Sequence, residues 1–430
     1  MALARTSKPP AYTSPRQEIA SLASLPAVHN VFAWFHAQRQ KFREWQVEFT
    51  RIPAPPFGEA ARARWLRARF EELGLEAVTT DQVGNVVGLR AGIDGPDHVV
   101  AVTAHIDTVF PSGTPVEVRR EGDKLFGPGI SDNASGATAM LAMAAALADF
   151  GIQTHKPILF VGNVGEEGEG DLRGMRHLFT RSPWKDAIER TLVIDGAGTE
   201  TIVTQALGSR RFEVTAHAKG GHSWSDFGEP NPIVVLARAV AALYEVPLTS
   251  TPDVKSAYNV GVIQGGTSVN SIPAVASMRV DLRSSSQADI ERLSHELNHI
   301  VAAASRNSRL SAGPAGDSAT RVRVSVEKIG ERPAAELSSD ARILQIVRAV
   351  DAHLGINSRL HRSSTDANIP LALGREAVSV GAGGVGGGAH TLNEWFDTSG
   401  RELGLKRILL ILLALATQVT PPEADNGTPQ

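Results

Sequence analysis

Apolar and polar residues change their spacing several times along this chain, and each spacing predicts a type of element. Residues 28–51 predict a helix that ends before a proline-rich segment, because proline cannot continue a helix. Residues 60–73 predict an amphipathic helix and residues 134–150 an alanine-rich one. Short apolar runs that predict strands occupy residues 85–89, 98–103, 158–163 and 191–194. This alternation indicates an α/β domain with a mostly parallel sheet.

The pattern changes near residue 209 and changes back near residue 332. Residues 211–218 alternate apolar and polar side chains, as a half-exposed strand does. The elements that follow complete the order β-α-β-β-α-β of a ferredoxin-like α+β unit. We therefore expect a discontinuous main domain and an inserted domain. Their expected bounds are residues 1–208 with 332–430, and residues 209–331.

The amino-acid composition limits which metal ligands and which classes of partner are plausible. The 430 residues include no cysteine, so any metal must be held by His, Asp or Glu. The formal net charge is −3 and no basic stripe stands out, which argues against nucleic acid as a partner. The longest strongly apolar run, residues 408–416, is too short to span a membrane and predicts a buried C-terminal helix. The first residues contain no apolar stretch typical of a secretory signal, so we expect a cytoplasmic protein.

Polar residues follow several of the apolar runs. His105 and Asp107, in the segment AVTAHIDTV, face the same side of a strand end, where the Asp can orient a metal-binding His. Asp132, in GPGISDNASGA, precedes the alanine-rich helix, where Asp is also a favoured N-cap. Glu166 and Glu167, in VGEEGEG, would repel each other unless a cation or a proton lies between them. Each of these segments alone also fits an ordinary structural or surface role.

Two further segments complete the group. Asp195 ends another apolar strand, and ligands of open α/β sheets bind outside the carboxyl ends of strands. His390 follows a glycine run, and Glu394 stands one helical turn later in GGGAHTLNEW. Together the segments deliver two histidines and several carboxylates to one sheet edge. Nitrogen and oxygen ligands without sulfur suit zinc, manganese or cobalt, and a bridging carboxylate would indicate two metal ions.

The order of these motifs resembles that of a known family. H-x-D, S-D-N, E-E, D-G, G-G-H and H-x-x-x-E follow one another as in the di-zinc peptidases and deacylases. These are typified by peptidase T, carnosinase-type dipeptidases, carboxypeptidase G and acetylornithine deacetylase. The resemblance covers residues 52–419. It implies two Zn²⁺ ions per chain, with Co²⁺ or Mn²⁺ as possible substitutes.

The resemblance also implies a role for each residue of the site. His105 and Asp195 would bind one zinc ion, Glu167 and His390 the other, and Asp132 would bridge both.

Three other residues would act beside these ligands. Glu166 would be the general base, Asp107 would orient a zinc-binding histidine, and Glu394 would support the ligands from behind. The Asp132–Asn133 peptide bond is expected to be cis.

The inserted domain is implied to act as a lid and as the surface of a homodimer. His222, in GGHSW, would reach the active site of the partner subunit. Asn270 and Arg283 would bind a substrate carboxylate, which an arginine recognises through two parallel hydrogen bonds.

The leading hypothesis is a zinc-dependent exopeptidase that cleaves di- or tripeptides, because the segment SSTDANIP resembles peptidase T-like members. An N-acyl-amino-acid deacylase on the same scaffold is the alternative, and a non-catalytic peptide-binding dimer is a third hypothesis. The run GAGGVG fits G-x-G-x-x-G, but no helix clearly opens there, so it does not predict a nucleotide site. No G-x-S-x-G motif supports a serine hydrolase.

Overall fold

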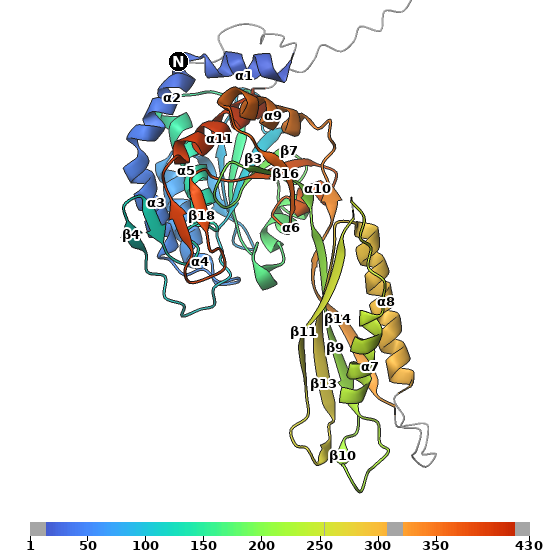
Figure 1. The fold of residues 1–430 in the computed structure, drawn as a ribbon. Coiled ribbons are helices and arrows are strands. Elements are labelled where there is room, and N and C mark those ends of the chain that lie inside the picture. Colours follow the sequence, from blue (N-terminus) through green and yellow to red (C-terminus); the bar gives the residue numbers. More distant parts are fainter. Residues whose placement is uncertain (1–13, 253, 308–320, 418–430) are drawn as a thin grey trace, which may run out of the picture. The chain divides into compact units, whose positions relative to one another are not determined.

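The computed structural model describes residues 14–252, 254–307 and 321–417 (Figure 1). The chain forms two compact units. Unit 1 consists of Met1–Thr204 and Glu336–Gln430, and unit 2 is Gln205–Ala335.

Unit 1 is built on a nine-stranded mixed sheet with the order β1-β2-β6-β3-β7-β17-β8-β15, in which β16 also pairs with β8. The central strands β6, β3, β7 and β17 are parallel, whereas β1, β2 and β8 pair antiparallel. The α/β class is confirmed, with parallel pairing among the four central strands. The strands are β1 (Glu76–Thr80), β2 (Val86–Arg90), β3 (Val99–His105), β6 (Ile158–Asn163), β7 (Ile188–Ile194), β8 (Thr201–Ala206), β15 (Ala335–Glu336), β16 (Arg359–Ser363) and β17 (Glu376–Val380).

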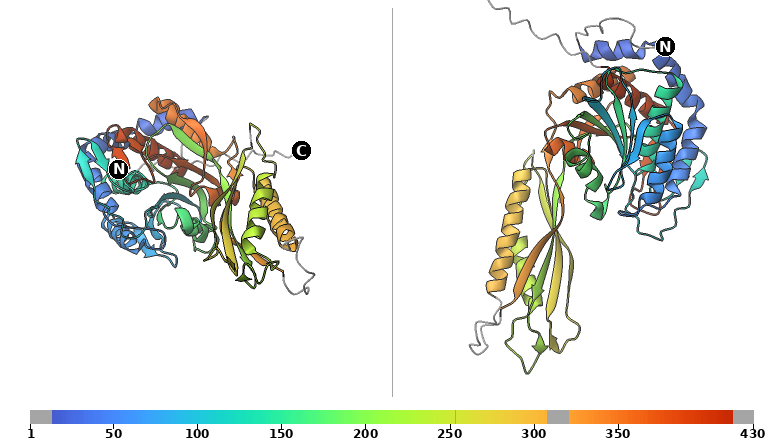
Figure 2. Two further views of the ribbon diagram at one scale, coloured as in Figure 1. Left: turned by 60° about the horizontal axis from the view of Figure 1, so that its bottom comes forward. Right: turned by 180° about the vertical axis from the view of Figure 1, so that it is seen from behind.

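Helices cover both faces of this sheet (Figure 2). Helices α4, α5 and α11 pack on one face, and α6 and α10 pack on the other with a cluster of buried apolar side chains. The helices are α1 (Pro15–Ala23), α2 (Pro26–Ala37), α3 (Arg39–Thr50), α4 (Ala60–Glu72), α5 (Ala134–Asp149), the 3₁₀ turn η1 (Gly168–Gly170), α6 (Arg173–Thr180), α9 (Arg342–Leu354), α10 (Asn368–Ala372) and α11 (Arg401–Ala416).

The N-terminal helical region differs from the expected single helix. The segment is two helices, because Gln38 leaves the helical conformation at φ −89° and ψ 6° between α2 and α3. The break lets Trp34 and Phe42 pack edge to face, with ring centroids 5.6 Å apart. Helix α1 precedes this pair and was not predicted.

Helix α11 is buried along its apolar length, as the run at residues 408–416 predicts. Across the described part of the chain, the structure has no helix whose length and apolar character would let it cross a membrane.

A small four-stranded sheet in unit 1 brings two distant loops together. Its order is β18-β19-β5-β4, and Trp395 of β19 pairs with Phe126 of β5. The loop that follows β5 leads to Asp132, and the loop between β18 and β19 carries His390. The strands are β4 (Arg119–Glu121), β5 (Lys124–Phe126), β18 (Val385–Gly387) and β19 (Trp395–Asp397).

Unit 2 contains the predicted order β-α-β-β-α-β. Its antiparallel sheet has the order β11-β13-β9-β14, and α7 and α8 cover one face (Figures 1 and 2). The short strands β10 and β12 form a separate two-stranded ribbon. The elements are β9 (Gly208–His217), β10 (Gly221–His222), α7 (Pro232–Tyr244), β11 (Ser256–Gly265), β12 (Ser271–Ile272), β13 (Val275–Ser284), α8 (Gln287–Arg306) and β14 (Arg323–Arg332).

Candidate metal centre

Three parallel strands deliver polar residues to one edge of the large sheet. His105 is the last residue of β3, Glu166 and Glu167 follow β6, and Asp195 follows β7. Because these strands are parallel neighbours, their carboxyl ends meet at the same edge. Asp132 comes from the segment before α5, and Gly136 lets α5 approach the end of β7. A side chain at Gly136 would lie 2.5 Å from the carbonyl oxygen of Ile194.

Asp132 lies between two histidines that come from distant parts of the chain. Its Oδ1 is 3.0 Å from Nε2 of His105, and its Oδ2 is 3.1 Å from Nε2 of His390. Asp195 adds an oxygen 3.6 Å from Nε2 of His105, and Glu167 adds one 3.0 Å from Nε2 of His390. Each histidine therefore has its own carboxylate partner and shares Asp132.

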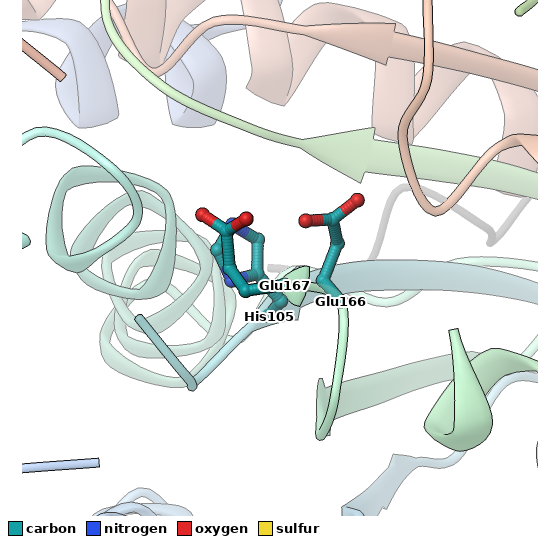
Figure 3. Close-up of side chains that lie close together, drawn as sticks. All are labelled: His105, Glu166 and Glu167. Carbon is teal, nitrogen blue, oxygen red and sulfur yellow. The ribbon is translucent and has the colours of Figure 1, made fainter. Parts of the chain in front are cut away.

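The candidate ligands form overlapping groups that could each hold an ion. One group is His105, Asp132 and Asp195, and another is Asp132, Glu167 and His390, with ligand atoms within 4.8 Å of one another. A third group joins His105 to Glu166 and Glu167. Figure 3 shows the two neighbouring glutamates directing their carboxylates to the same side. This donor set contains only nitrogen and oxygen, so it fits borderline or hard divalent cations such as zinc or manganese.

Asp107 holds the two glutamates as well as the histidine. Its carboxylate accepts the backbone N–H of Glu166 at 3.0 Å and that of Glu167 at 2.8 Å. Its Oδ1 also lies 3.5 Å from Nδ1 of His105, on the side of the ring opposite Asp132. One buried carboxylate thereby orients the ring of His105 and the turn that carries both glutamates.

Glu394 supports the loop that carries Asp132. It is fully buried and accepts the backbone N–H groups of Gly129, Ser131 and Asp132 at 2.7–2.8 Å. Burial raises the pKa of Glu394 to about 7, although these N–H groups act to lower it. The expectation that Glu394 stands one helical turn after His390 is wrong. The segment is a series of turns, which begins at Gly388 and places His390 at φ 64°.

The histidines and carboxylates of the centre shift one another's pKa values. Burial alone would lower the pKa of His105, but the nearby carboxylates of Asp107, Asp132 and Asp195 raise it well above its usual value. Hydrogen bonds to Asp132 and Glu167 raise the pKa of His390 to about 10. The pKa of Asp132 is lowered, because the two histidines outweigh the effect of burial. The carboxylates thus favour positive charge between them, which protons or metal cations can supply.

The sequence assigned no role to Asp366, which lies in the segment SSTDANIP. It is buried, and its Oδ2 accepts a hydrogen bond of 2.7 Å from Nδ2 of Asn163, the last residue of β6. Burial raises the pKa of Asp366 to about 7. Its place in SSTDANIP, the segment that resembles peptidase T-like members, is the signal that could have drawn attention to it.

The three residues expected to contact substrate lie in unit 2. His222 and Asn270 are neighbours, because β10 pairs with β12 and the N–H of Ser223 donates to the carbonyl of Asn270 at 3.0 Å. Arg283 stands near the other end of β13, about 26 Å from Val275 at roughly 3.3 Å per residue. Within one chain, therefore, the sheet separates Arg283 from the pair His222 and Asn270.

The Asp132–Asn133 peptide bond is cis, as the resemblance implies. Residues 101–414 match the model of the peptidase family M20/M25/M40. The chain belongs to this family. The family-level resemblance drawn from the motifs is therefore confirmed.

The chain is 26% identical over 244 residues to carboxypeptidase G2 of Pseudomonas sp., a match that covers 54% of this chain. The chain spans 57% of the length of that relative, and 52% of a probable carboxypeptidase from Uncinocarpus reesii.

Solved structures share the fold over most of the chain. A tripeptidase from Staphylococcus aureus matches with a TM-score of 0.70 and 21% identity, covering 88% of this chain and 99% of that one. The Bacillus subtilis YXEP protein, described as a dinuclear metal-binding peptidase of the M20 family, matches with a TM-score of 0.63 and 16% identity. That match covers 89% of this chain and 100% of the YXEP chain.

Proposed function

We propose that this chain is a co-catalytic di-zinc metallopeptidase that hydrolyses amide bonds of small peptides, with di- and tripeptides as substrates. The observation that carries the proposal is the position of Asp132, whose two oxygens each face a different histidine. A carboxylate in this position is suited to bridge two cations. Membership of a peptidase family supports the reaction class.

The residues present fit the proposed pair of ions. His105 and Asp195 would hold one ion, Glu167 and His390 the other, and Asp132 both. Bound there, the ions would polarise the scissile carbonyl and lower the pKa of the attacking water.

Glu166 is the proposed general base. Its carboxylate would accept the proton of the attacking water and then pass that proton to the nitrogen of the leaving amine. Asp107 fixes the turn that holds Glu166 through backbone hydrogen bonds, so the base is held in place by a buried group. A family member without catalytic activity would not need a general base. The presence of Glu166 therefore argues against a non-catalytic binding protein.

Unit 2 would complete the site in a homodimer. Strand β11 is at an edge of its sheet and exposes Val262 and Ile263, and the adjacent helix α7 exposes Ile233 and Tyr244. An exposed edge strand beside apolar side chains is a surface that another chain can cover. His222 of one chain would then donate a hydrogen bond to the tetrahedral oxygen formed in its partner's site, where Asn270 of the same chain and Arg283 of the partner would bind the substrate carboxylate.

A substrate panel tests the proposal. Purified chain loaded with zinc, cobalt or manganese is assayed on free-amine di- and tripeptides and on N-acetyl amino acids, before and after chelation. Cleavage of the peptides that is lost on chelation supports a peptidase. Cleavage of the N-acetyl amino acids alone would instead indicate the deacylase, which uses the same donor set.

A further inference from the structure

Arg62 is a buried cation beside the metal centre that the mechanism does not use. It lies on α4 and is only 1% exposed. The guanidinium donates to three backbone carbonyls: Nε to Ile52 at 2.7 Å, Nη1 to Ile106 at 3.0 Å and Nη2 to Thr50 at 3.4 Å. It also lies 4.7 Å from the centre of the Phe49 ring.

Burying the charged guanidinium costs free energy, because it loses its contact with water. Among the described residues, no carboxylate is a hydrogen-bond partner of Arg62 that would offset this cost. Burial lowers the pKa of Arg62 to about 10, and the nearby Asp107 and Glu394 carboxylates act in the opposite direction. Arg62 therefore remains a cation at neutral pH. An apolar residue could fill the same space without burying a charge, but it would leave the three carbonyls without their donor, so the role of Arg62 lies in holding those carbonyls.

The carbonyl that Nη1 binds belongs to Ile106, which directly follows the end of β3. Ile106 stands between His105 and Asp107, and its N–H donates to the carbonyl of Asn163 at the end of β6. One residue beyond Asp107, the N–H of Thr108 donates to the carbonyl of Ala54. The end of β3 is thus fixed on one side by β6 and on the other by Arg62 and the segment after α3.

We propose that Arg62 is a positioning residue for the metal centre. Its fork holds the peptide between His105 and Asp107, so that the ring of His105 points at Asp132 and the Asp107 carboxylate reaches the turn of the two glutamates. Arg62 precedes residue 101, where the family match begins. The inference rests on the proposed metal site and is independent of which substrate is cleaved.

The direction in which a substitution of Arg62 changes zinc affinity distinguishes a positioning role from a purely electrostatic one. A positive charge near a cation site repels the cation, so removing it would tighten metal binding if charge were all that mattered. Loss of positioning weakens binding instead. Lysine keeps the charge but offers a single ammonium in place of the planar fork, so it cannot hold three separate carbonyls in the same way.

The test is zinc affinity of the metal-free chain, measured by competition with a chromophoric chelator. Arg62→Met should weaken zinc binding ~10-fold or more, in the range seen when groups that orient metal ligands are removed. Arg62→Lys should weaken it by a smaller factor.

Arg407→Met is the matched control. Arg407 is equally buried but pairs with the carboxylate of Asp351, with two contacts of 2.7 Å. This variant should lower Tm and leave the zinc affinity of the folded chain unchanged.

Zinc binding by Arg62→Met that equals or exceeds wild type would overturn the inference. If Arg62→Met does not fold, Arg62→Lys decides, and wild-type affinity in that variant overturns it as well. Wild-type chain that binds no zinc refutes the metal centre and this inference together. Wild-type chain that binds zinc but cleaves no peptide refutes the proposed activity and leaves the role of Arg62 standing.

Discussion

His390 Nε2 lies 3.1 Å from Oδ2 of Asp132, although 258 positions separate the two residues in the chain. The contact exists because the small sheet pairs β19 with β5 and so brings the two loops together. Asp132 also faces His105 with its other oxygen. The geometry therefore joins two candidate ion sites through one carboxylate.

The position of Asp132 between two candidate ion sites predicts the metal content of the protein. We expect close to two metal ions per chain in fully loaded protein, measured by elemental analysis after gel filtration. Asp132→Ala should reduce binding at both sites, because it removes the shared ligand. His390→Ala should reduce it at one site only. Chain that carries no metal, with activity that chelators leave unchanged, would contradict the two-ion centre.

Glu166→Gln should lower turnover ~10²-fold or more, because the amide keeps the shape of the side chain but cannot accept the proton. Metal content should stay near that of wild type, since Glu167 and not Glu166 faces His390. Glu169→Gln is the matched control, an exposed glutamate of the same segment that should keep normal turnover. Normal turnover in Glu166→Gln would show that the base has been assigned wrongly.

Asp107→Ala should reduce metal affinity or activity ~10–100-fold. The carboxylate orients the ring of His105 and also accepts the backbone N–H groups of Glu166 and Glu167, so its loss loosens both sides of the centre. Zinc competition and kcat are the measurements. A purely structural aspartate would give a different result, with a lower Tm and unchanged metal affinity in the folded protein.

Arg283→Ala should affect substrates with a free carboxylate most. The side chain is 44% exposed and pairs with Asp281 at 2.6 Å, so we expect a loss of about 10-fold in kcat/KM and not the larger loss of a buried pair. Amidated and free-acid forms of one peptide are compared. Arg279→Ala is the control, because Arg279 is on the same strand, also exposed, and pairs with Glu213. Equal losses for both peptide forms would indicate damage to the fold.

Much of the site could be predicted because its residues follow strands. A buried parallel strand has a distinctive apolar run, and the polar residue after that run must emerge at the carboxyl edge. His105, Glu166, Glu167 and Asp195 were found in this way, and the structure places them at one edge.

Other features depend on contacts between distant segments, which local spacing does not record. The antiparallel pairing of β2 with β6 and the turns between His390 and Glu394 are set by neighbours far along the chain. The hydrogen bond between Asn163 and Asp366 joins positions 203 apart. The role of Arg62 could not be predicted, because an arginine in an amphipathic helix is typical of a surface position. Its contacts with three backbone carbonyls depend on the tertiary fold.

The final prediction is that the active site is shared between two subunits. His222 and Asn270 are neighbours at the ribbon of β10 and β12, whereas Arg283 stands near the far end of β13 in the same chain. Residues that bind one small substrate cannot lie so far apart, so we expect His222 and Asn270 to come from the partner chain of a two-fold dimer.

Co-expression of two inactive variants tests this sharing. Homodimers of His222→Ala or of Glu166→Gln should be nearly inactive, because every site lacks one of the two groups. A mixed dimer contains one site with both groups intact. Random pairing makes about half of the dimers mixed, each with one good site of two, so the mixture should recover roughly a quarter of wild-type activity. If His222 acts within its own chain, every site in the mixture keeps a defect and activity stays near zero. Sedimentation run alongside establishes that dimers are present, and dimers without recovery would refute donation by His222 across subunits while leaving the metal chemistry intact.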